Sequence, residues 1–480
     1  MNKILCNTGN GCVYAYSKNY KEFVYLPKDF EIAIDSSTLK ESSDDYYARK
    51  SKFLEEKGFF DTVKHDFTDT YPSQSILYNL ANLRSFVIEV TDGCNMACKY
   101  CGYRDLYDNY DERHNKKLSF NVVKSFIDYL KDLWNSPYNI SYNNTITVSF
   151  YGGEPLTNMK LIRETIDYLE SLNLPTITFR YNMTTNAYLL KECMDYLVEK
   201  DFSLLISLDG NRKNNSYRVL KNDKETFDVV VKNVKLLQET YPEFFESNVR
   251  FNSVLHNRNS SEEAIDYIQT TFGKVPNVAL LNTNGVAKEK EEEFKKMFMT
   301  EVFVERDYSS CEDIDSDMLL ADSKITLYNS FLSAFLSDTY TAYPDLFEED
   351  NLPYVPTGTC QPFSRKIFLT VNGKILPCER VGQLFSLGTV TEEKVDIDFE
   401  YVSNFYANKY KKIIKRCSQC VLWKNCGLCV FYLKKKENGE EYCDRFLPYT
   451  KASAYMGEML SFFENTPWIY KRILEDLSVY

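Results

Sequence analysis

Between residue 85 and about residue 284, the sequence alternates between short apolar runs and longer segments with helical spacing. The short runs are expected strands and the longer segments are expected helices. The expected strands are 85–90, 146–150, 177–182, 203–208, 249–255 and 275–281, and the expected helices are 118–134, 158–172, 189–200, 227–240 and 261–271. This alternation predicts an α/β fold with a parallel sheet, in which functional loops follow the carboxyl ends of the strands.

Three cysteines directly follow the first expected strand. The segment Thr91–Tyr103 reads Thr-Asp-Gly-Cys-Asn-Met-Ala-Cys-Lys-Tyr-Cys-Gly-Tyr and spaces Cys94, Cys98 and Cys101 as C-x3-C-x2-C. Three thiolates on one loop can bind three irons of a [4Fe–4S] cluster and leave the fourth iron open. Taken alone, the triplet could also be a zinc loop or three unrelated buried thiols.

Further motifs stand at the ends of later expected strands. Gly152-Gly-Glu-Pro155 follows the second strand, Thr184-Thr-Asn186 the third and Ser207-Leu-Asp-Gly210 the fourth, and Arg218 comes soon after. With the cysteine triplet, this order of motifs resembles the radical S-adenosylmethionine (SAM) superfamily and its partial (β/α)6 barrel. Each motif alone would be weak evidence, because Gly-Gly-Glu-Pro is a common turn and a lone arginine is usually a surface residue.

The resemblance implies a role for each of these motifs. The open iron would chelate SAM, and reduction of SAM would give a 5′-deoxyadenosyl radical that abstracts hydrogen from carbon. Two glycines would let the backbone approach a ligand closely. The implied contacts are Tyr100 near the adenine, Gly152, Gly153 and Glu154 at the SAM amino group, Thr185, Asn186, Ser207 and Asp209 near the ribose, and Arg218 at the SAM carboxylate.

Seven more cysteines form a second group near the C-terminus. They are Cys360, Cys378, Cys417, Cys420, Cys426, Cys429 and Cys443. The four between residues 417 and 429 alone would suggest a zinc ribbon, but seven suit two sites better than one tetrahedral zinc. Their spacing resembles the SPASM extension of radical SAM enzymes, which carries two auxiliary [4Fe–4S] clusters. The chain has two residues, where that family usually has three, between the fifth and sixth cysteines.

The resemblance implies which cysteines hold each auxiliary cluster. The distal cluster would take Cys417, Cys420, Cys426 and Cys443, and the proximal cluster would take Cys360, Cys378 and Cys429. The proximal cluster then lacks one ligand, because residues 351–359 contain no cysteine where sulfatase maturases have one. A vacant iron would favour a substrate thiolate and therefore thioether formation. Alternatively, Cys311 or Glu379 fills the position. Glu379 also stands about where sulfatase maturases have a carboxylate base, so it is the candidate catalytic residue.

Five parts are expected along the chain: residues 1–80, a leader-peptide recognition domain; 81–284, the radical SAM partial barrel; 285–350, a helical bridge; 351–450, the SPASM domain; and 451–480, a C-terminal helix. A weakly alternating stretch at 21–34 predicts a strand pair, and helical spacing predicts a helix at 46–57. Together they resemble a winged-helix domain that binds a leader peptide as an added strand. An ordinary N-terminal extension is the alternative. In the bridge, helices are expected at 288–297 and 325–335.

Composition narrows the classes of function. The 480 residues carry a net charge of −12, and the longest basic run is Lys434–Lys436, so no nucleic-acid partner is expected. Neither a signal sequence nor an apolar run near 18 residues is present, which predicts a soluble, cytoplasmic protein with no membrane partner. Fourteen cysteines in a reducing compartment favour metal binding over disulfides. With three scattered histidines, the metal ligands should be sulfur.

The predicted function is that of a radical SAM peptide maturase with three [4Fe–4S] clusters. It would install a thioether or other cross-link in a ribosomally made precursor peptide, with electrons from a donor such as flavodoxin or ferredoxin. The run from Cys101 to Arg113 resembles maturases of Cys-rich or Gly-rich precursors. The alternatives are an anaerobic sulfatase maturase, which forms formylglycine, and a zinc-binding protein without enzymatic activity.

Overall fold

The computed structural model describes residues 4–18, 20–27, 45–61, 67–141, 144–298, 323–336, 355–423, 426–436 and 438–477. The chain divides into two compact units. Unit 1 comprises residues 1–69, 305–359 and 408–480, and unit 2 comprises residues 70–304 and 360–407. Each unit is therefore assembled from segments that lie far apart in the sequence.

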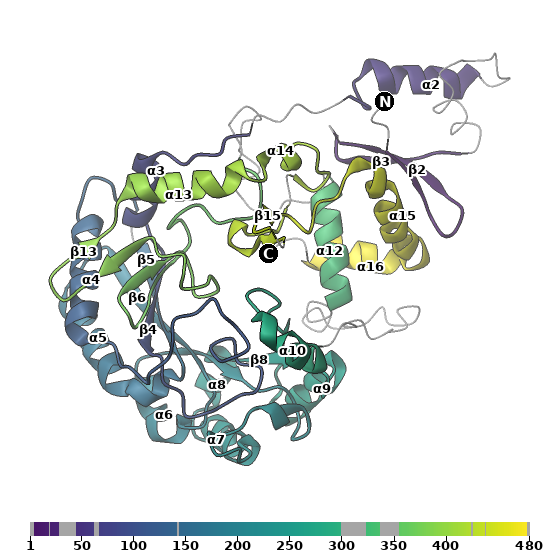
Figure 1. The fold of residues 1–480 in the computed structure, drawn as a ribbon. Coiled ribbons are helices and arrows are strands. Elements are labelled where there is room, and N and C mark those ends of the chain that lie inside the picture. The colour runs from purple at the N-terminus through teal and green to yellow at the C-terminus, as the bar shows by residue number, and fades with distance from the viewer. Residues whose placement is uncertain are drawn as a thin grey trace. The chain divides into compact units, whose positions relative to one another are not determined.

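A ten-stranded sheet forms the centre of unit 2, in the order β13-β12-β11-β10-β4-β5-β6-β7-β8-β9 (Figure 1). The strands are β4 (Ser85–Thr91), β5 (Asn144–Gly152), β6 (Ile177–Thr185), β7 (Ser203–Ser207), β8 (Val249–Leu255), β9 (Asn277–Leu280), β10 (Ile367–Leu369), β11 (Lys374–Leu376), β12 (Gly388–Val390) and β13 (Val395–Asp396). Strands β4 to β9 run parallel, as predicted. Strand β10 joins β4 in parallel, and β11 to β13 continue antiparallel.

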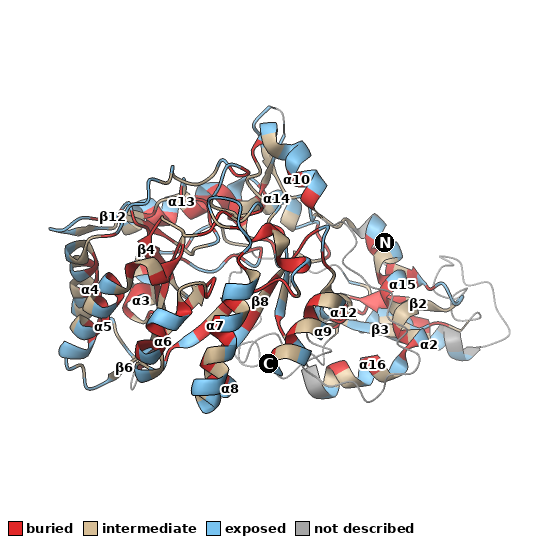
Figure 2. Cartoon of the chain, turned by 90° about the horizontal axis from the view of Figure 1, so that it is seen from below, coloured by how far each residue is buried: buried red, intermediate tan, exposed pale blue. Residues whose placement is uncertain are grey.

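Helices cover one face of this sheet. They include α3 (Ser73–Ala81), α4 (Phe120–Trp134), α5 (Met159–Ser171), α6 (Leu190–Glu199), α7 (Phe227–Thr240), α8 (Pro242–Asn248) and α9 (Ser261–Phe272). Unit 2 also contains the short 3-10 turns η1 (Pro155–Asn158), η2 (Asn214–Tyr217) and η3 (Lys288–Lys290), and the helix α10 (Glu291–Met297), whose Phe294 packs with Tyr107. Helix α4 illustrates why they form, because Val123, Phe126, Ile127, Leu130 and Trp134 recur at helical spacing and are all buried. The outward sides of helices such as α7 and α8 are exposed (Figure 2).

The opposite face of the sheet is more polar. Along β5, Ile146, Val148 and Phe150 are buried, whereas the alternate positions are exposed or half-buried. Phe86 of β4 and Phe179 of β6 both contact Trp134 of α4, which identifies the helix-covered side. Because side chains alternate along a strand, Thr147, Ser149 and Tyr151 must point to the other side. This concave face is the interior of the partial barrel.

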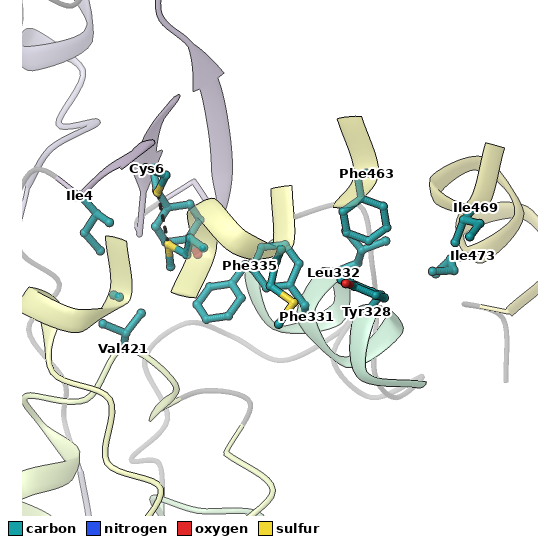
Figure 3. Packing of buried hydrophobic residues seen from close by; sticks show 14 of the residues in the cluster. Ile4, Cys6, Tyr328, Phe331, Leu332, Phe335, Val421, Phe463, Ile469 and Ile473 are labelled. Atoms are coloured by element: carbon teal, nitrogen blue, oxygen red, sulfur yellow. Dashed lines mark hydrogen bonds between the residues drawn. The ribbon is translucent and has the colours of Figure 1, made fainter. Parts of the chain in front are cut away.

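Unit 1 joins the two ends of the chain. Its elements are β1 (Ile4–Asn7), β2 (Val13–Ser17), β3 (Glu22–Tyr25), α2 (Asp45–Glu56), α12 (Ser323–Phe335), α14 (Ile414–Cys417), η7 (Val430–Tyr432), β14 (Lys434–Lys435), β15 (Glu441–Tyr442), α15 (Tyr449–Asn465), α16 (Pro467–Arg472) and η8 (Ile473–Leu477), and α13 (Phe399–Lys411) crosses the boundary to unit 2. Ile4 and Cys6 of β1 share one apolar core with Phe335 of α12 and Phe463 of α15 (Figure 3). The N-terminal sheet is thus packed on the C-terminal helices.

The N-terminal sheet contains strands that the sequence did not predict. Of the strand pair expected at 21–34, the described residues contain one strand, β3, and residues 28–34 lie outside the described residues, so the second strand stays a prediction. Its partner is β2, which pairs in turn with β1, and neither was predicted. Their buried residues, such as Cys6, contact distant partners such as Met456, so local alternation carries little signal. The expected helices at 46–57, 288–297 and 325–335 are confirmed within a few residues, the middle one as η3 followed by α10.

Candidate functional site

The loop after β4 carries three half-buried thiols, Cys94, Cys98 and Cys101. Backbone bonds hold the loop against the segment after η2, because Ala97 N donates to Val219 O (2.7 Å) and Lys99 N donates to Tyr217 O (3.0 Å). Burial raises the pKa of Cys94 and of Cys98 to about 12, and the three thiols lie within one another's electrostatic field.

This thiol set fits an iron–sulfur cluster. A bound metal deprotonates a coordinating thiol outright, which removes the cost of burying three thiolates. Among the described residues, no three His, Cys, Asp or Glu side chains converge tightly enough to bind a single metal ion. A four-iron cluster spreads its cysteine ligands over separate irons, so three cysteines on one loop suit it.

The Gly-Gly-Glu loop after β5 lies directly against the cysteine loop. Gly153 N donates to Thr91 O (2.9 Å), and Glu154 N donates to Gly93 O (2.9 Å). A Cβ atom on Gly152 would lie 2.2 Å from Thr91 O, and one on Gly153 would lie 2.2 Å from Gly93 O. The sequence suggested that these glycines admit a ligand. In the structure, their first effect is to let two backbone loops touch.

Glu154 is a buried carboxylate with no cationic partner among the described residues. Its Oε1 accepts hydrogen bonds from Thr185 Oγ1 (2.7 Å) and Leu156 N (3.1 Å), and its Oε2 accepts one from Asn186 N (2.8 Å). Burial raises the pKa of Glu154 to about 7, although these hydrogen bonds oppose the rise. Asn186 also donates from Nδ2 to Asn95 Oδ1 (2.8 Å) in the cysteine loop. Such a carboxylate is suited to receive a donor group, such as an amino group, from a ligand.

A second buried carboxylate, Asp209, already has its cation. Arg218 donates from Nε to Asp209 Oδ2 (2.9 Å) and from Nη2 to Oδ1 (2.7 Å), and the hydroxyl of Tyr100 also donates to Asp209. Burial acts to raise the pKa of Asp209, but Arg218 and the hydrogen bonds outweigh it, and the pKa falls to about 2. The structure therefore brings Tyr100, Asp209 and Arg218 together. Arg218 Nη1 makes no hydrogen bond to the described residues and is left for a ligand.

Two residues of this group escaped the sequence analysis. His256 is fully buried, with Nε2 3.7 Å from Asp209 Oδ2 and its ring centroid 5.6 Å from that of Tyr100. Asn259 donates from Nδ2 to the Asp209 carbonyl (3.2 Å) and accepts from His256 N through Oδ1 (2.8 Å). Both residues follow the carboxyl end of β8. The predicted site residues occupy the same position after the earlier strands. The same rule would have found them. Ser207 lies at the end of β7 opposite Asn252.

Arg113 is the last residue of the run from Cys101 to Arg113 that the sequence analysis singled out, and its contacts give this run a structural role. Its Nη2 donates to Glu89 Oε1 (2.9 Å), its Nη1 donates to Asp92 O (3.0 Å), and its guanidinium lies 3.7 Å from the ring centroid of Tyr103. Glu89 Oε2 accepts from Val371 N (2.9 Å), beyond the end of β10. Arg113 thus fastens the segment after the cysteines to the sheet.

Four cysteines of the C-terminal group lie together in unit 1. Burial raises the pKa of Cys417 to about 12, and the thiols of Cys426, Cys420 and Cys443 add to the rise. A Cβ atom on Gly358 would lie 2.4 Å from Cys426 O, so the segment around residue 358 packs closely on them. These four are the predicted distal set.

The remaining C-terminal positions are divided between the two units. Cys360 and Cys378 belong to unit 2, whereas Cys429 belongs to unit 1. Cys311, one suggested extra ligand, lies outside the described residues. The carboxylate of Glu379 accepts from Lys366 Nζ through both oxygens, at 3.1 and 3.2 Å.

Comparison with known proteins gives a consistent set of relatives. Residues 88–271 match the family model of the radical SAM superfamily. The radical SAM cyclopropyl synthase TigE of Paramaledivibacter caminithermalis is 21% identical over 372 residues, which are 76% of this chain and 71% of that protein. A cysteine-type anaerobic sulfatase-maturating enzyme of Clostridium novyi is 28% identical over 168 residues, 34% of this chain and 43% of that protein. The chain thus matches less than half of the latter protein's length.

Among solved structures, native anSMEcpe with bound AdoMet and Kp18Cys peptide has a TM-score of 0.53 at 18% identity. The match covers 82% of this chain and 99% of that one. At this identity the likeness establishes the shared α/β fold.

Proposed function

The chain contains a domain of the radical SAM superfamily, and from this premise we propose that it modifies a ribosomally made precursor peptide by forming a thioether or another cross-link. The observation that carries the radical SAM part is the contact between two loops. Three half-buried thiols and a buried carboxylate without a cation among the described residues lie on loops that share backbone hydrogen bonds. The Kp18Cys peptide named with the anSMEcpe structure supports the choice of a peptide substrate.

When bound, a [4Fe–4S] cluster and SAM supply a 5′-deoxyadenosyl radical. Cys94, Cys98 and Cys101 would hold the cluster. Glu154 would accept hydrogen bonds from the SAM amino group, and Arg218 would donate from Nη1 to the SAM carboxylate while it remains paired with Asp209. Since all of these residues stand at carboxyl ends of parallel strands, one edge of the sheet positions the whole set.

The proposal extends to two auxiliary clusters held by the C-terminal cysteines. The gathering of Cys417, Cys420, Cys426 and Cys443 supports the distal one. Thioether formation is preferred to formylglycine formation because Glu379 is poorly disposed to act as the base. Both of its oxygens accept from Lys366, so the carboxylate would have to leave this contact to reach a proton of the substrate.

Sulfatase maturation is the second candidate. It is favoured by the similarity to the Clostridium novyi enzyme, and it would require Glu379 to leave Lys366 and act as the base. Glu379→Gln separates the two functions, because formylglycine formation should be lost whereas cross-link formation should persist. Each activity is measured by the mass change of the respective peptide.

The central test replaces Cys94, Cys98 and Cys101 by alanine. The reduced variant should release no 5′-deoxyadenosine from SAM, and its iron content should fall from about twelve to about eight per chain if the other two clusters survive. Cys193→Ala is the matched control, because Cys193 is a buried cysteine of α6 outside both cysteine groups. Release of 5′-deoxyadenosine by the triple variant at the wild-type rate would refute the radical SAM assignment.

Recognition of a leader peptide by residues 1–80 is part of the same proposal. Among the described strands, β3 is an edge of the three-stranded sheet, so a leader strand could pair beside it. Deleting this segment would remove Ile4 and Cys6 from the core of unit 1, so a gentler measurement is needed. The amides of β3 should gain protection from hydrogen exchange when a precursor peptide is added, and those of α5 should not. Unchanged exchange in β3 would exclude this edge.

A further inference from the structure

A cavity of about 350 Å³ lies on the concave face of the unit 2 sheet. This volume falls within the range of about 300–1,000 Å³ that is typical of ligand sites. Hydroxyl and amide side chains of Ser149, Asn182, Thr184 and Ser203 line it. None of the residues proposed to contact SAM is among its lining residues, so the cavity is a different site within the same barrel.

Three charged side chains line the cavity: Arg250, Lys366 and Glu379. Lys366 and Glu379 pair with each other through two hydrogen bonds and neutralise one another. Arg250 makes no ion pair or side-chain hydrogen bond to the part of the chain that the structure describes. The cavity therefore keeps one uncompensated positive charge, although the chain as a whole has a net charge of −12.

The position of Arg250 on β8 fixes the direction of its side chain. Its neighbour Phe251 is fully buried and stacks on Phe272 of α9, with ring centroids 5.0 Å apart. Because Phe251 faces the helices, Arg250 must face the concave side. In the parallel register it stands beside Leu205 of β7, which also lines the cavity. The guanidinium of an arginine suits a carboxylate, because it can donate two parallel hydrogen bonds to the two carboxylate oxygens.

We propose that this cavity binds a carboxylate of the peptide substrate at Arg250, either an Asp or Glu side chain or the C-terminal carboxylate. The proposal rests on the proposed function in that it takes the substrate to be a peptide. Hydroxyl and amide groups around the cavity would hold the peptide next to the anchored group. Binding there would set which residue of the peptide faces the SAM site, so Arg250 is a specificity-determining residue.

The test uses the full-length enzyme with reconstituted clusters and bound SAM. It is mixed with two random eight-residue peptide libraries, one capped at both ends and one with a free C-terminal carboxylate, and retained peptides are sequenced by mass spectrometry. Enrichment of Asp and Glu in the capped library identifies a side-chain carboxylate, and preference for the uncapped library identifies the C-terminus. A hydrogen bond to a charged group predicts an enrichment of roughly tenfold to a hundredfold.

Three variants make the test specific. Arg250→Gln should abolish the enrichment. Arg180→Gln is the matched control, because Arg180 is an exposed arginine of β6 outside the cavity lining, and its loss should leave the enrichment unchanged. Glu379→Gln should increase the enrichment, because it frees Lys366 to bind the same carboxylate. A gain is an effect that misfolding does not produce.

The results separate this inference from the proposed function. Wild-type enzyme that retains no peptide, or retains peptides regardless of carboxylates, would overturn the carboxylate site. Equal loss of enrichment in the Arg250 and Arg180 variants would overturn it as well. Release of 5′-deoxyadenosine is measured on the same wild-type preparation. If it occurs without carboxylate preference, the inference fails alone, whereas its absence means that the proposed function fails.

Discussion

The loops after β5 and β7 each bury one carboxylate, but the surroundings shift the pKa values of the two carboxylates in opposite directions. Glu154 after β5 has only hydrogen-bond donors around it, and burial raises its pKa to about 7. Asp209 after β7 is equally buried, but Arg218 and several donors overcome the effect of burial and lower its pKa to about 2. Glu154 thus lacks a counter-charge among the described residues until a ligand supplies one, whereas Asp209 has its counter-charge, Arg218, within the protein. Burial alone does not distinguish a binding group from a structural one. The presence of a cation does.

The largest effect on stability is expected at the ion pair between Asp209 and Arg218. Asp209→Asn would leave the guanidinium of Arg218 buried without its counter-charge, and breaking a buried ion pair in this way costs about 3–5 kcal/mol of unfolding free energy. Denaturant titration under anaerobic conditions measures the loss. The double variant Asp209→Asn, Arg218→Met should be less destabilised than the single one. A single variant as stable as wild type would show that the pair is not structural.

Glu154→Gln should mainly affect ligand binding. The amide cannot accept all the hydrogen bonds that the carboxylate accepts, and it lacks the charge that favours an amino group. SAM affinity should fall by roughly tenfold to a hundredfold, as expected for a hydrogen bond to a charged group. Equilibrium dialysis with labelled SAM measures the affinity, and Glu170→Gln at an exposed position of α5 serves as the surface control. Equal SAM affinity of wild type and Glu154→Gln would remove Glu154 from the site.

The pH dependence of the two carboxylates should have opposite signs. Because the pKa of Glu154 is raised to about 7, its contribution to stability without SAM is present at acidic pH and is lost as the pH rises through about 7. Because the pKa of Asp209 is lowered to about 2, its contribution is present above its ordinary range and is lost only as the pH falls toward 2. Of these two carboxylates, only that of Glu154 should therefore titrate between pH 6 and 8.

SAM binding provides the corresponding measurement. Binding requires the ionised carboxylate, so SAM affinity should weaken below a pH of about 7 by up to roughly tenfold per unit, or about 1.4 kcal/mol. The same titration on Glu154→Gln should be flat by comparison. An identical pH profile in the variant would assign the dependence to another group.

The smallest effect is expected from Thr185→Val. This change keeps the shape of the side chain but removes the donor to Glu154 Oε1. Loss of one such bond should cost about 0.5–1.5 kcal/mol of SAM binding, and the acidic decline in affinity should begin at a higher pH because the carboxylate loses a stabilising donor. Thr165→Val on α5 is the control, since that hydroxyl donates only to its own helix at Leu161 O.

The sequence predicts unit 2 far better than unit 1. In unit 2, apolar alternation and strand-end motifs are local signals, so β4 to β9 and the positions of Cys94, Glu154 and Asp209 follow from them. The pairing of Arg218 with Asp209 does not follow from such local signals, because the sequence suggested that each residue would contact SAM. In unit 1, β1 depends on residues more than four hundred positions away, as the contact of Cys6 with Met456 shows. No local pattern records such a partner.

The described residues include no helix long and apolar enough to cross a membrane.

The contact of Gly153 with Gly93 has a consequence for protein engineering. Because a Cβ atom at Gly153 would lie 2.2 Å from the Gly93 carbonyl, the two loops fit as a matched pair with no tolerance between them. A chimera that takes the cysteine loop from one relative and the Gly-Gly-Glu loop from another would combine surfaces that were never fitted together. Exchanging both loops as one cassette should preserve the fit, whereas exchanging either one alone should not.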